Sequence, residues 1–242
     1  MTFDSVYEMF NPLTDVRNQH FWDWFSGRTL NTGTDGRWGI GSQDSATGNT
    51  WDMADEINGG IKLTTGSDVD NQAIYMSFMS GTSNGTVTTI PIKPFKSGIA
   101  NMIFTYKINQ AQSACGNFGG GFHRDGRGDM AGGNMATLSG SSTSSTFNFR
   151  TSNSGGSQGE TSSSVSLDTD WHVYKLSANV TADPTGAGTS SKLYIDGVLE
   201  ASRTSAIGYF SETVAPLFSV QRNSTTSGGA SCNVGYCEAW NG

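Results

Sequence analysis

Apolar and polar residues alternate along most hydrophobic segments of this chain, and this period of two is typical of a β-strand with one buried face. Around residue 104, Met102, Phe104 and Tyr106 lie on one face and Thr105 lies on the other. Further segments with strand-like patterns are 61–65, 73–79, 117–123, 146–150, 171–178, 192–196, 216–222 and 233–240. One early segment, 15–25, also permits a short helical turn or an arm. Because helical spacing is otherwise absent, the pattern predicts an all-β fold.

The segment 171–178 departs from simple alternation. Val173 would lie on one face, while Tyr174 and Leu176 would lie on the other. Strands with apolar residues on both faces are typical of positions covered on both sides. We therefore predict a strand in the middle of a sandwich, with both faces buried.

The dipeptide Asp196-Gly197 separates two short runs of strand-forming residues. A two-residue type I′ turn needs positive φ at both positions, which Asp tolerates and Gly adopts freely. The alternative is that Asp196 is a catalytic carboxylate. The turn explains the residue fully, so we assign Asp196 to a hairpin and not to catalysis.

Gly-, Ser- and Thr-rich connections separate the predicted strands, and none is long enough to mark a domain linker. We predict a single two-sheet antiparallel β-sandwich over residues 21–242, preceded by an N-terminal arm or first strand at 1–20. A domain of this size buries a core without disulfides.

Composition supports this prediction and narrows the function. The 242 residues are 35% hydrophobic and only 14% charged, with 32 glycines and a formal charge of −7. A negative surface repels phosphate and anionic lipid, so we expect no nucleic-acid partner. No apolar run approaches the ~20 residues of a membrane span, so we expect no membrane insertion. The first residues lack the pattern of a signal peptide.

The three cysteines, Cys115, Cys232 and Cys237, are expected to be buried thiols rather than a disulfide. Cys232 and Cys237 are five positions apart. On a regular strand an odd separation places two side chains on opposite faces, where they cannot form a bond. A bond from Cys115 to one of them remains an alternative.

Four segments together resemble concanavalin A-like and laminin-G-like jelly rolls. Residues 171–176 are WHVYKL, 193–197 are LYIDG, 216–220 are PLFSV and 58–63 are NGGIKL. In that superfamily a strand of the first kind leads into a hairpin of the second, and the C-terminal strand lies beside the N-terminal one. The resemblance covers roughly residues 20–240 and implies a jelly-roll fold.

The low charge and the Gly/Ser/Thr-rich surface also resemble single-domain proteins of tailed phages and other virus particles. This resemblance implies a non-enzymatic virion structural protein, such as a capsid decoration or fibre-type protein. The expected partners are capsid or other virion proteins, further copies in a homo-oligomer, and a cell-surface glycan. The expected location is the virion, after synthesis in the host cytoplasm without a signal peptide.

The competing interpretation is a glycan-cleaving enzyme of the same fold, either a glycoside hydrolase or a polysaccharide lyase. Family 16 hydrolases carry an E-x-D-x-x-E strand, and retaining hydrolysis needs two carboxyl groups ~5–5.5 Å apart. The nearest stretch here runs from Asp52 to Glu56 and has a different spacing. For a lyase, His172 is expected to be a packed or edge residue of its strand, and His123, in a Gly-rich loop before RDGRGDM, is expected to face solvent. We assign no catalytic residue.

Two candidate binding sites come from loops. Trp51, next to Asn49 in a predicted loop, is the best rim aromatic for carbohydrate, with the acidic residues Asp68 and Asp70 as a second contact. Asp125 and Asp129 are weak candidates for structural calcium. Residues 127–129 form an Arg-Gly-Asp triplet that a glycine-rich chain contains easily by chance.

Overall fold

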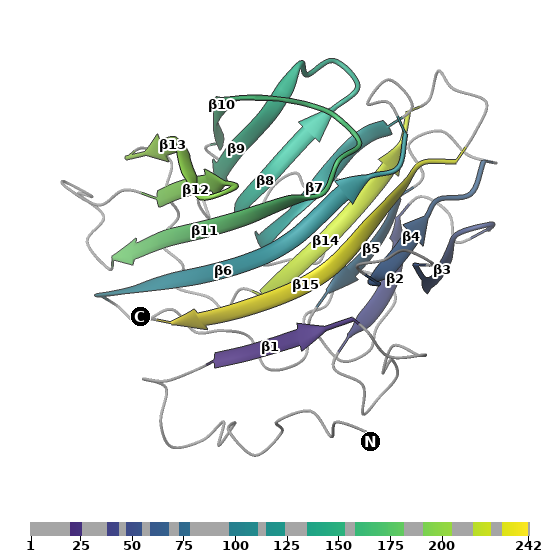
Figure 1. Cartoon of the computed structure of the whole chain (residues 1–242), viewed down its shortest axis with the longest axis horizontal. Helices are drawn as coiled ribbons and strands as arrows, with labels where there is room; N and C mark the ends of the chain where they lie inside the picture. The colour runs from purple at the N-terminus through teal and green to yellow at the C-terminus, as the bar shows by residue number, and fades with distance from the viewer. Residues whose placement is uncertain are drawn as a thin grey trace.

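In the computed structural model, two antiparallel β-sheets pack face to face (Figure 1). The structure describes residues 20–25, 38–43, 47–54, 59–67, 73–77, 97–110, 115–123, 135–152, 158–181, 191–204, 215–223 and 229–241. Those ranges contain no helix, and therefore none that is long and apolar enough to cross a membrane. The predicted all-β antiparallel sandwich is confirmed.

In both sheets, several neighbouring strands are far apart in the sequence. Sheet A has the order β13 (Val198–Arg203), β12 (Ser191–Ile195), β11 (His172–Thr181), β6 (Ser97–Ile108), β15 (Ser231–Asn241), β4 (Ile61–Thr64) and β3 (Thr50–Met53), with β1 (His20–Trp24) paired to β15. Sheet B has the order β10 (Gln158–Ser166), β9 (Thr146–Ser152), β8 (Met135–Ser141), β7 (Cys115–His123), β14 (Ala215–Arg222), β5 (Ala73–Ser77) and β2 (Gly39–Gln43). The N-terminal and C-terminal strands of the described chain thus lie side by side, as the resemblance to jelly rolls implies.

The segments expected from the apolar pattern form strands where the structure describes them, and residues 78–79 of the segment 73–79 lie outside the described residues. The segment 15–25 is different, because its described part forms strand β1 at His20–Trp24 rather than a helical turn. The rest of the predicted arm lies outside the described residues. Strands β2, β3, β8 and β10 were not predicted. The Gly, Ser and Thr residues of β2, β8 and β10 have the composition of loops, and β3 is only 4 residues long. Pairing with neighbouring strands decides their conformation.

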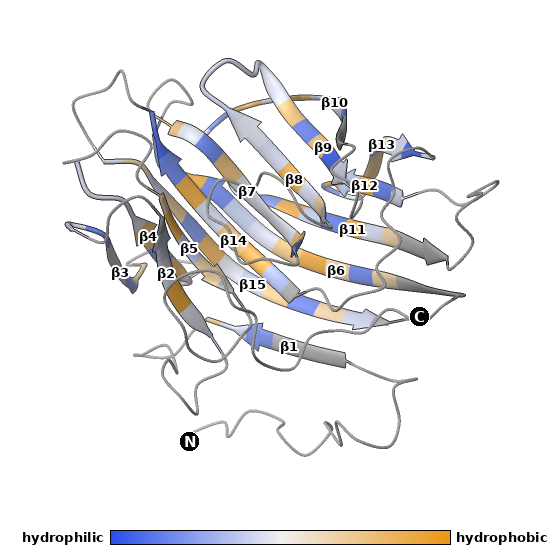
Figure 2. Cartoon of the chain, turned by 180° about the vertical axis from the view of Figure 1, so that it is seen from behind, coloured by the Kyte–Doolittle hydropathy of each residue, from blue (hydrophilic) through white to orange (hydrophobic). Residues whose placement is uncertain are grey.

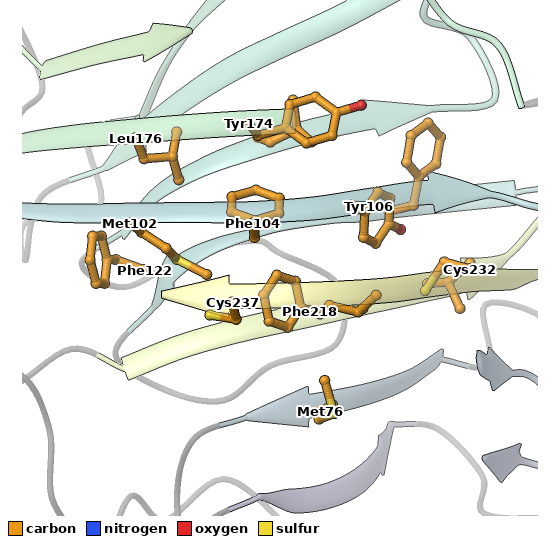
Figure 3. Close-up of a cluster of buried hydrophobic side chains, with 14 of the residues drawn as sticks. Met76, Met102, Phe104, Tyr106, Phe122, Tyr174, Leu176, Phe218, Cys232 and Cys237 are labelled. Atoms are coloured by element: carbon orange, nitrogen blue, oxygen red, sulfur yellow. The ribbon is translucent and has the colours of Figure 1, made fainter. Parts of the chain in front are cut away.

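Aromatic side chains from both sheets fill the core (Figure 3). Phe104 of β6 stacks on Tyr174 of β11, with ring centroids 5.2 Å apart, and meets Phe218 of β14 edge-on at 5.2 Å. The Tyr106 hydroxyl crosses the core and donates a hydrogen bond of 2.9 Å to the carbonyl of Ser219. Along β9 the alternation of apolar and polar residues is visible in Figure 2. The period-two pattern therefore positions one face of each sheet inward.

The cysteines are free and buried, as expected, but the reasoning from their spacing was wrong. Cys232 and Cys237 both point into the core (Figure 3), because a bulge near Gly235 shifts the register of β15 by one residue. The bulge cancels the odd separation. Burial raises the pKa of the Cys115 and Cys232 thiols to about 12, so neither is ionised at neutral pH.

One end of the sandwich is closed by side chains of β13. Arg203 donates from Nε to Thr151 Oγ1 at 2.9 Å and from Nη1 to Thr161 Oγ1 at 2.6 Å. Glu200 accepts hydrogen bonds from the backbone N–H and the hydroxyl of Ser164. These bonds join the edge strand of sheet A to β9 and β10 of sheet B.

One expectation about burial was wrong. Val173 of β11 is 47% exposed, so this strand has one open face rather than two covered ones. The described tryptophans differ in burial: Trp38 is 1% exposed, whereas Trp24 is 61% exposed and Trp51 and Trp171 are half-buried. Large aromatic area therefore remains at the surface of sheet A.

Candidate functional site

The outer face of sheet B, opposite the core, carries a continuous row of small polar residues. Strand register aligns Asn148, Ser139, Gly119, Ser219 and Tyr75 across β9, β8, β7, β14 and β5. Neighbouring strands lie about 4.8 Å apart, so this row spans roughly 19 Å. Thr137 lies two residues before Ser139 on β8 and therefore on the same face. We call these six residues the polar row.

Strand β7 forms a floor of glycine under the polar row. Gly119 and Gly121 both have φ of 150°, a conformation that residues with side chains rarely adopt. A β-carbon at Gly119 would lie 2.1 Å from the carbonyl oxygen of Leu138, and one at Gly121 would lie 2.5 Å from that of Ala136. Since Phe118 and Phe122 point into the core, β7 presents only backbone to the outer face between Asn117 and His123.

Three hydroxyl groups of the polar row, those of Thr137, Ser139 and Ser219, are buried and have no hydrogen-bond partner among the described residues. Thr137 is 0% exposed, Ser139 3% and Ser219 0%, and in the described part of the chain none of their side-chain oxygens is hydrogen-bonded. The Oδ1 atom of Asn148 is also buried and unpaired. A buried polar group without a partner costs about 1–3 kcal/mol, so native proteins usually avoid such groups. Their concentration on one face marks it as a place for a hydrogen-bonding ligand or ordered water.

An apolar patch adjoins the hydroxyl groups. Tyr75 of β5 is 6% exposed and packs against Leu217 of β14. The tyrosine ring lies directly over Gly41 of β2, where a β-carbon would be 2.2 Å from the ring. An aromatic ring beside convergent hydroxyl groups is the combination that binding sites for sugars use, because a sugar ring has an apolar face and polar edges.

One ion pair lies at the end of the polar row. Arg150 of β9 donates to Glu160 Oε2 of β10 from Nη2 at 2.8 Å and from Nε at 3.1 Å. Asn148 donates to Glu160 Oε1 at 2.5 Å. Both carboxylate oxygens of Glu160 are therefore engaged, and no other carboxylate lies on the described outer face of sheet B.

The predicted turn at Asp196-Gly197 is confirmed, and its carboxylate has an additional contact. Asp196 has φ of 51° and Gly197 of 86°, as a type I′ turn requires. Asp196 Oδ1 accepts a hydrogen bond from the Val173 N–H at 2.9 Å, and Oδ2 lies 2.6 Å from His172 Nδ1. The other ring nitrogen of His172, Nε2, lies 3.1 Å from Asp168 Oδ1.

The two carboxylates control the charge of His172. Burial acts to lower the pKa of His172, but the bonds to Asp196 and Asp168 outweigh it and hold the pKa above 6.5. Burial acts to raise the pKa of Asp196, but the bonds from His172 and Val173 outweigh it and hold the pKa below 3.8. With both nitrogens engaged and the side chain 12% exposed, His172 is packed, as predicted, and is poorly placed to act as a base.

The other predicted site residues lie apart from the polar row or outside the described chain. His123 is 0% exposed in β7, so the expected solvent-facing loop position was wrong. Trp51 lies in strand β3 rather than in a loop and packs against the core. Asn49 donates to Ser42 Oγ and the Ala73 carbonyl and accepts from the Gly66 N–H, so its amide joins the two sheets. A carbohydrate role for Asn49 and Trp51 stays a prediction.

The remaining candidates, Asp68, Asp70, Asp125 and Asp129, lie outside the described residues, as do the Arg-Gly-Asp triplet and Glu56. Within the described ranges, His, Cys, Asp and Glu side chains form no cluster suited to a metal ion. The proposed calcium site therefore stays a prediction.

The sequence contained one signal for the polar row. Three consecutive glycines, Gly119 to Gly121, lie between two core phenylalanines in a predicted strand. Glycine inside a strand often marks a place where another backbone or a ligand comes close. The serine and threonine members gave no signal, because similar residues fill the connections.

Comparison with known proteins gives matches in structure but not in sequence. No family model matches the chain, and no curated protein matches it. The carbohydrate recognition domain of Emp47p superposes with a TM-score of 0.55 and 11% identity, over 95% of this chain and 96% of that one. A family 16 endo-glucanase from Bacteroides ovatus has a TM-score of 0.55 and 12% identity, over 90% and 98%.

The chain has the concanavalin A-like jelly-roll fold. A third jelly-roll match, the binding domain of botulinum neurotoxin DC solved with rat synaptotagmin II, has a TM-score of 0.54 and 10% identity over 90% of this chain. The present chain spans 48% of that domain's length. At such identities the matches establish the fold, which carbohydrate-binding domains and glucanases share.

Proposed function

We propose that this jelly roll is a non-enzymatic carbohydrate-binding module whose ligand site is the outer face of sheet B. The unpartnered hydroxyl groups of the polar row carry the proposal. Sugar hydroxyl groups both donate and accept hydrogen bonds, so they can satisfy Thr137, Ser139 and Ser219 together. Tyr75 and Leu217 supply an apolar surface for the face of a sugar ring.

The outer face of sheet B lacks, among its described residues, the pair of carboxylates that glycan cleavage needs, and this supports binding rather than cleavage. Retaining hydrolysis needs two carboxyl groups ~5–5.5 Å apart, one of them acting as nucleophile. Glu160 is the single carboxylate of the described outer face, and Arg150 and Asn148 occupy both of its oxygens. Between the core phenylalanines, β7 offers glycine where a catalytic strand would need acidic side chains.

A glycan array followed by calorimetric titration of the best ligand tests the proposal. We expect the double variant T137V/S139A to bind at least about tenfold more weakly, because each lost hydrogen bond is worth roughly 0.5–1.5 kcal/mol. The matched control is S164A on the edge strand β10, whose hydroxyl donates to Glu200 away from this face. Equal affinity of wild type and double variant would refute the site.

Access to the face needs a separate measurement, because Thr137, Ser139 and Ser219 are 0–3% exposed. A glycan reaches them only if this face opens. Hydrogen exchange of the β7 and β8 amides, with and without glycan, reports such opening and its reversal. We expect the bound glycan to slow exchange there and to leave β11 and β12 unchanged.

The competing activity is glycan cleavage. We expect no release of reducing ends from β-glucans, agar, carrageenan or alginate. Release that is abolished by E56Q would replace our proposal with that of a hydrolase.

We propose further that the module is a structural component of a virus particle, where it binds capsid or other virion proteins as a homo-oligomer. The Gly/Ser/Thr-rich, charge-poor composition supports this setting. Residues 1–12 contain Phe3, Tyr7 and Phe10, which suit a contact arm. Deleting residues 1–12 is expected to lower the oligomer mass in sedimentation or to abolish particle attachment. Unchanged mass and attachment would contradict it.

A further inference from the structure

The outer face of sheet A, turned toward the viewer in Figure 1, combines exposed apolar residues with lysines. Of the large hydrophobic side chains that are exposed in the described chain, Trp24 (61%), Val173 (47%) and Leu199 (49%) lie on this face. Strand register places Trp24 beside Tyr236, Tyr236 beside Thr105 and Thr105 beside Val173. Soluble proteins usually expose such side chains singly, so their alignment across four strands marks an interaction surface.

Aromatic rings form the centre of this surface. The Trp24 and Tyr236 rings lie 4.4 Å apart at an angle of 41°. Trp171 packs over the bulge at Gly235, where a β-carbon would be 3.4 Å from the indole. Trp171, the residue before β11, therefore contacts β15 at Gly235, next in sequence to Tyr236. We call Trp24, Tyr236 and Trp171 the aromatic platform.

The charge of this surface is opposite to that of the whole chain. The chain carries −7, yet four of its six lysines lie on the outer face of sheet A: Lys62, Lys107, Lys175 and Lys192. Asp52 and Glu238 are the acidic side chains on the strands of this face that the structure describes. Four lysines against these two carboxylates give the described strands of this face an excess of positive charge. Tyr236 donates a hydrogen bond of 2.7 Å to Glu238.

Two of these lysines lie beside aromatic rings, whereas Lys62 lies opposite Asp52 in the register of β3 and β4. The Lys107 ammonium lies 5.4 Å from the centre of the Trp171 ring, and that of Lys175 lies 5.6 Å from the centre of Tyr194. In the described chain Lys62, Lys175 and Lys192 form no ion pair. In the described chain Lys175 is therefore held at an aromatic surface and remains available to an anion.

We propose that the outer face of sheet A binds an acidic polysaccharide, with a uronate or sialate carboxylate on Lys175 and sugar rings stacked on the platform of Trp24, Tyr236 and Trp171. An acidic sugar has an apolar ring face and a carboxylate at its edge, which matches a ring with a lysine beside it. A second copy of this face would bring lysines against lysines, so self-pairing is disfavoured. This surface lies on the opposite sheet from the polar row and does not depend on the function proposed for that row.

Titration with alginate hexasaccharide and oligosialic acid, with a neutral dextran oligosaccharide as comparison, tests the proposal. We expect at least one of the two acidic ligands to bind to the outer face of sheet A and dextran not to bind there. W24A is expected to weaken binding about tenfold through lost ring stacking. K175M, which keeps the aliphatic stem, is expected to weaken it about threefold to fivefold. Both positions are exposed, so both variants should fold.

The control for this face is T137V on the opposite sheet, which must leave the affinity for the acidic ligand unchanged. A loss with T137V, or unchanged affinity in both W24A and K175M, would overturn the proposal. So would tighter binding of single-stranded oligo-dT than of either acidic glycan. A fall in sedimentation mass with W24A would instead assign the face to contacts between copies of the chain and would also overturn it.

Discussion

Two buried threonines have different effects on stability, because only one of their hydroxyl groups has a hydrogen-bond partner among the described residues. Thr151 of β9 is 1% exposed, and its hydroxyl oxygen accepts a hydrogen bond from Arg203. Thr137 of β8 is 0% exposed, and its hydroxyl has no partner. The first hydroxyl therefore stabilises the fold, while the second costs stability in the absence of a ligand.

Substituting each threonine by valine separates these roles. We expect T137V to raise the free energy of unfolding by up to about 1 kcal/mol, because an isosteric methyl replaces an unpaired hydroxyl. We expect T151V to lower it by about 1 kcal/mol, because the half-buried guanidinium of Arg203 loses a partner. Urea denaturation of both variants measures the difference. A T137V protein that is less stable than wild type would mean that ordered water or the chain itself already satisfies this hydroxyl.

At the scale of elements, the alternating pattern predicted the strands whose inner face is aromatic or branched, such as β6 and β14. It failed for β8 and β10, because their serines and threonines are also the residues of turns. It also failed in β15, where the bulge near Gly235 inserts one residue and so reverses the faces to which the following side chains point. The hairpin at Asp196 was predictable because two adjacent residues determine it. The polar row was not, because it needs five strands in register.

The glycines of β7 allow a direct test of strand geometry. We expect G119A to destabilise the fold by several kcal/mol or to prevent folding, because its β-carbon would overlap the Leu138 carbonyl at a φ of 150°. The matched control is G197A, which also has a positive φ but has open space around it. That variant is expected to cost about 1 kcal/mol. Thermal melts compare the two, and equal losses would show that close contact at Gly119 is unimportant.

The contact between His172 and Asp196 ties the β12–β13 hairpin to β11 and gives stability a pH dependence. The pKa of His172 in the folded protein lies above 6.5, so protonated His172 stabilises the fold. This stabilisation is fully present below pH 6.5 and is lost as pH rises through the folded pKa. Because the folded pKa of Asp196 lies below 3.8, its contribution is present above pH 3.8 and is lost as pH falls through that folded value. The contact therefore contributes most between pH 3.8 and 6.5.

Melting curves of wild type and H172Q across pH 3–9 test this dependence. We expect the stability difference to be largest, roughly 1 kcal/mol, within that window and to shrink on both sides, with the value kept small by the exposure of Asp196. D196N keeps a residue that tolerates positive φ, so it serves as a control for the turn itself. A stability difference that does not vary with pH would contradict an ionic contact.

At the scale of the whole molecule, the sandwich presents two chemically different faces. The outer face of sheet B offers uncharged hydroxyl groups over a glycine floor, with one carboxylate that is already paired. The outer face of sheet A offers lysines beside aromatic rings. The net charge of −7 conceals this asymmetry, because sequence counts do not show which face a charge occupies. Only strand register places Lys107 and Lys175 on one surface.

Salt should distinguish the two faces in a single protein. Raising NaCl from about 0.05 M to 0.5 M shortens the screening length severalfold, so attraction between exposed charges falls while hydrogen bonding and stacking change little. We expect the affinity for an acidic oligosaccharide at sheet A to fall about tenfold or more, and that for a neutral glycan at sheet B to stay within about twofold. The K175M variant should show a shallower salt dependence than wild type, whereas T137V/S139A should keep the wild-type slope for the acidic ligand. Parallel salt dependence for both ligands would mean that they share one site, since on the strands that the structure describes only the outer face of sheet A carries an excess of lysines over carboxylates.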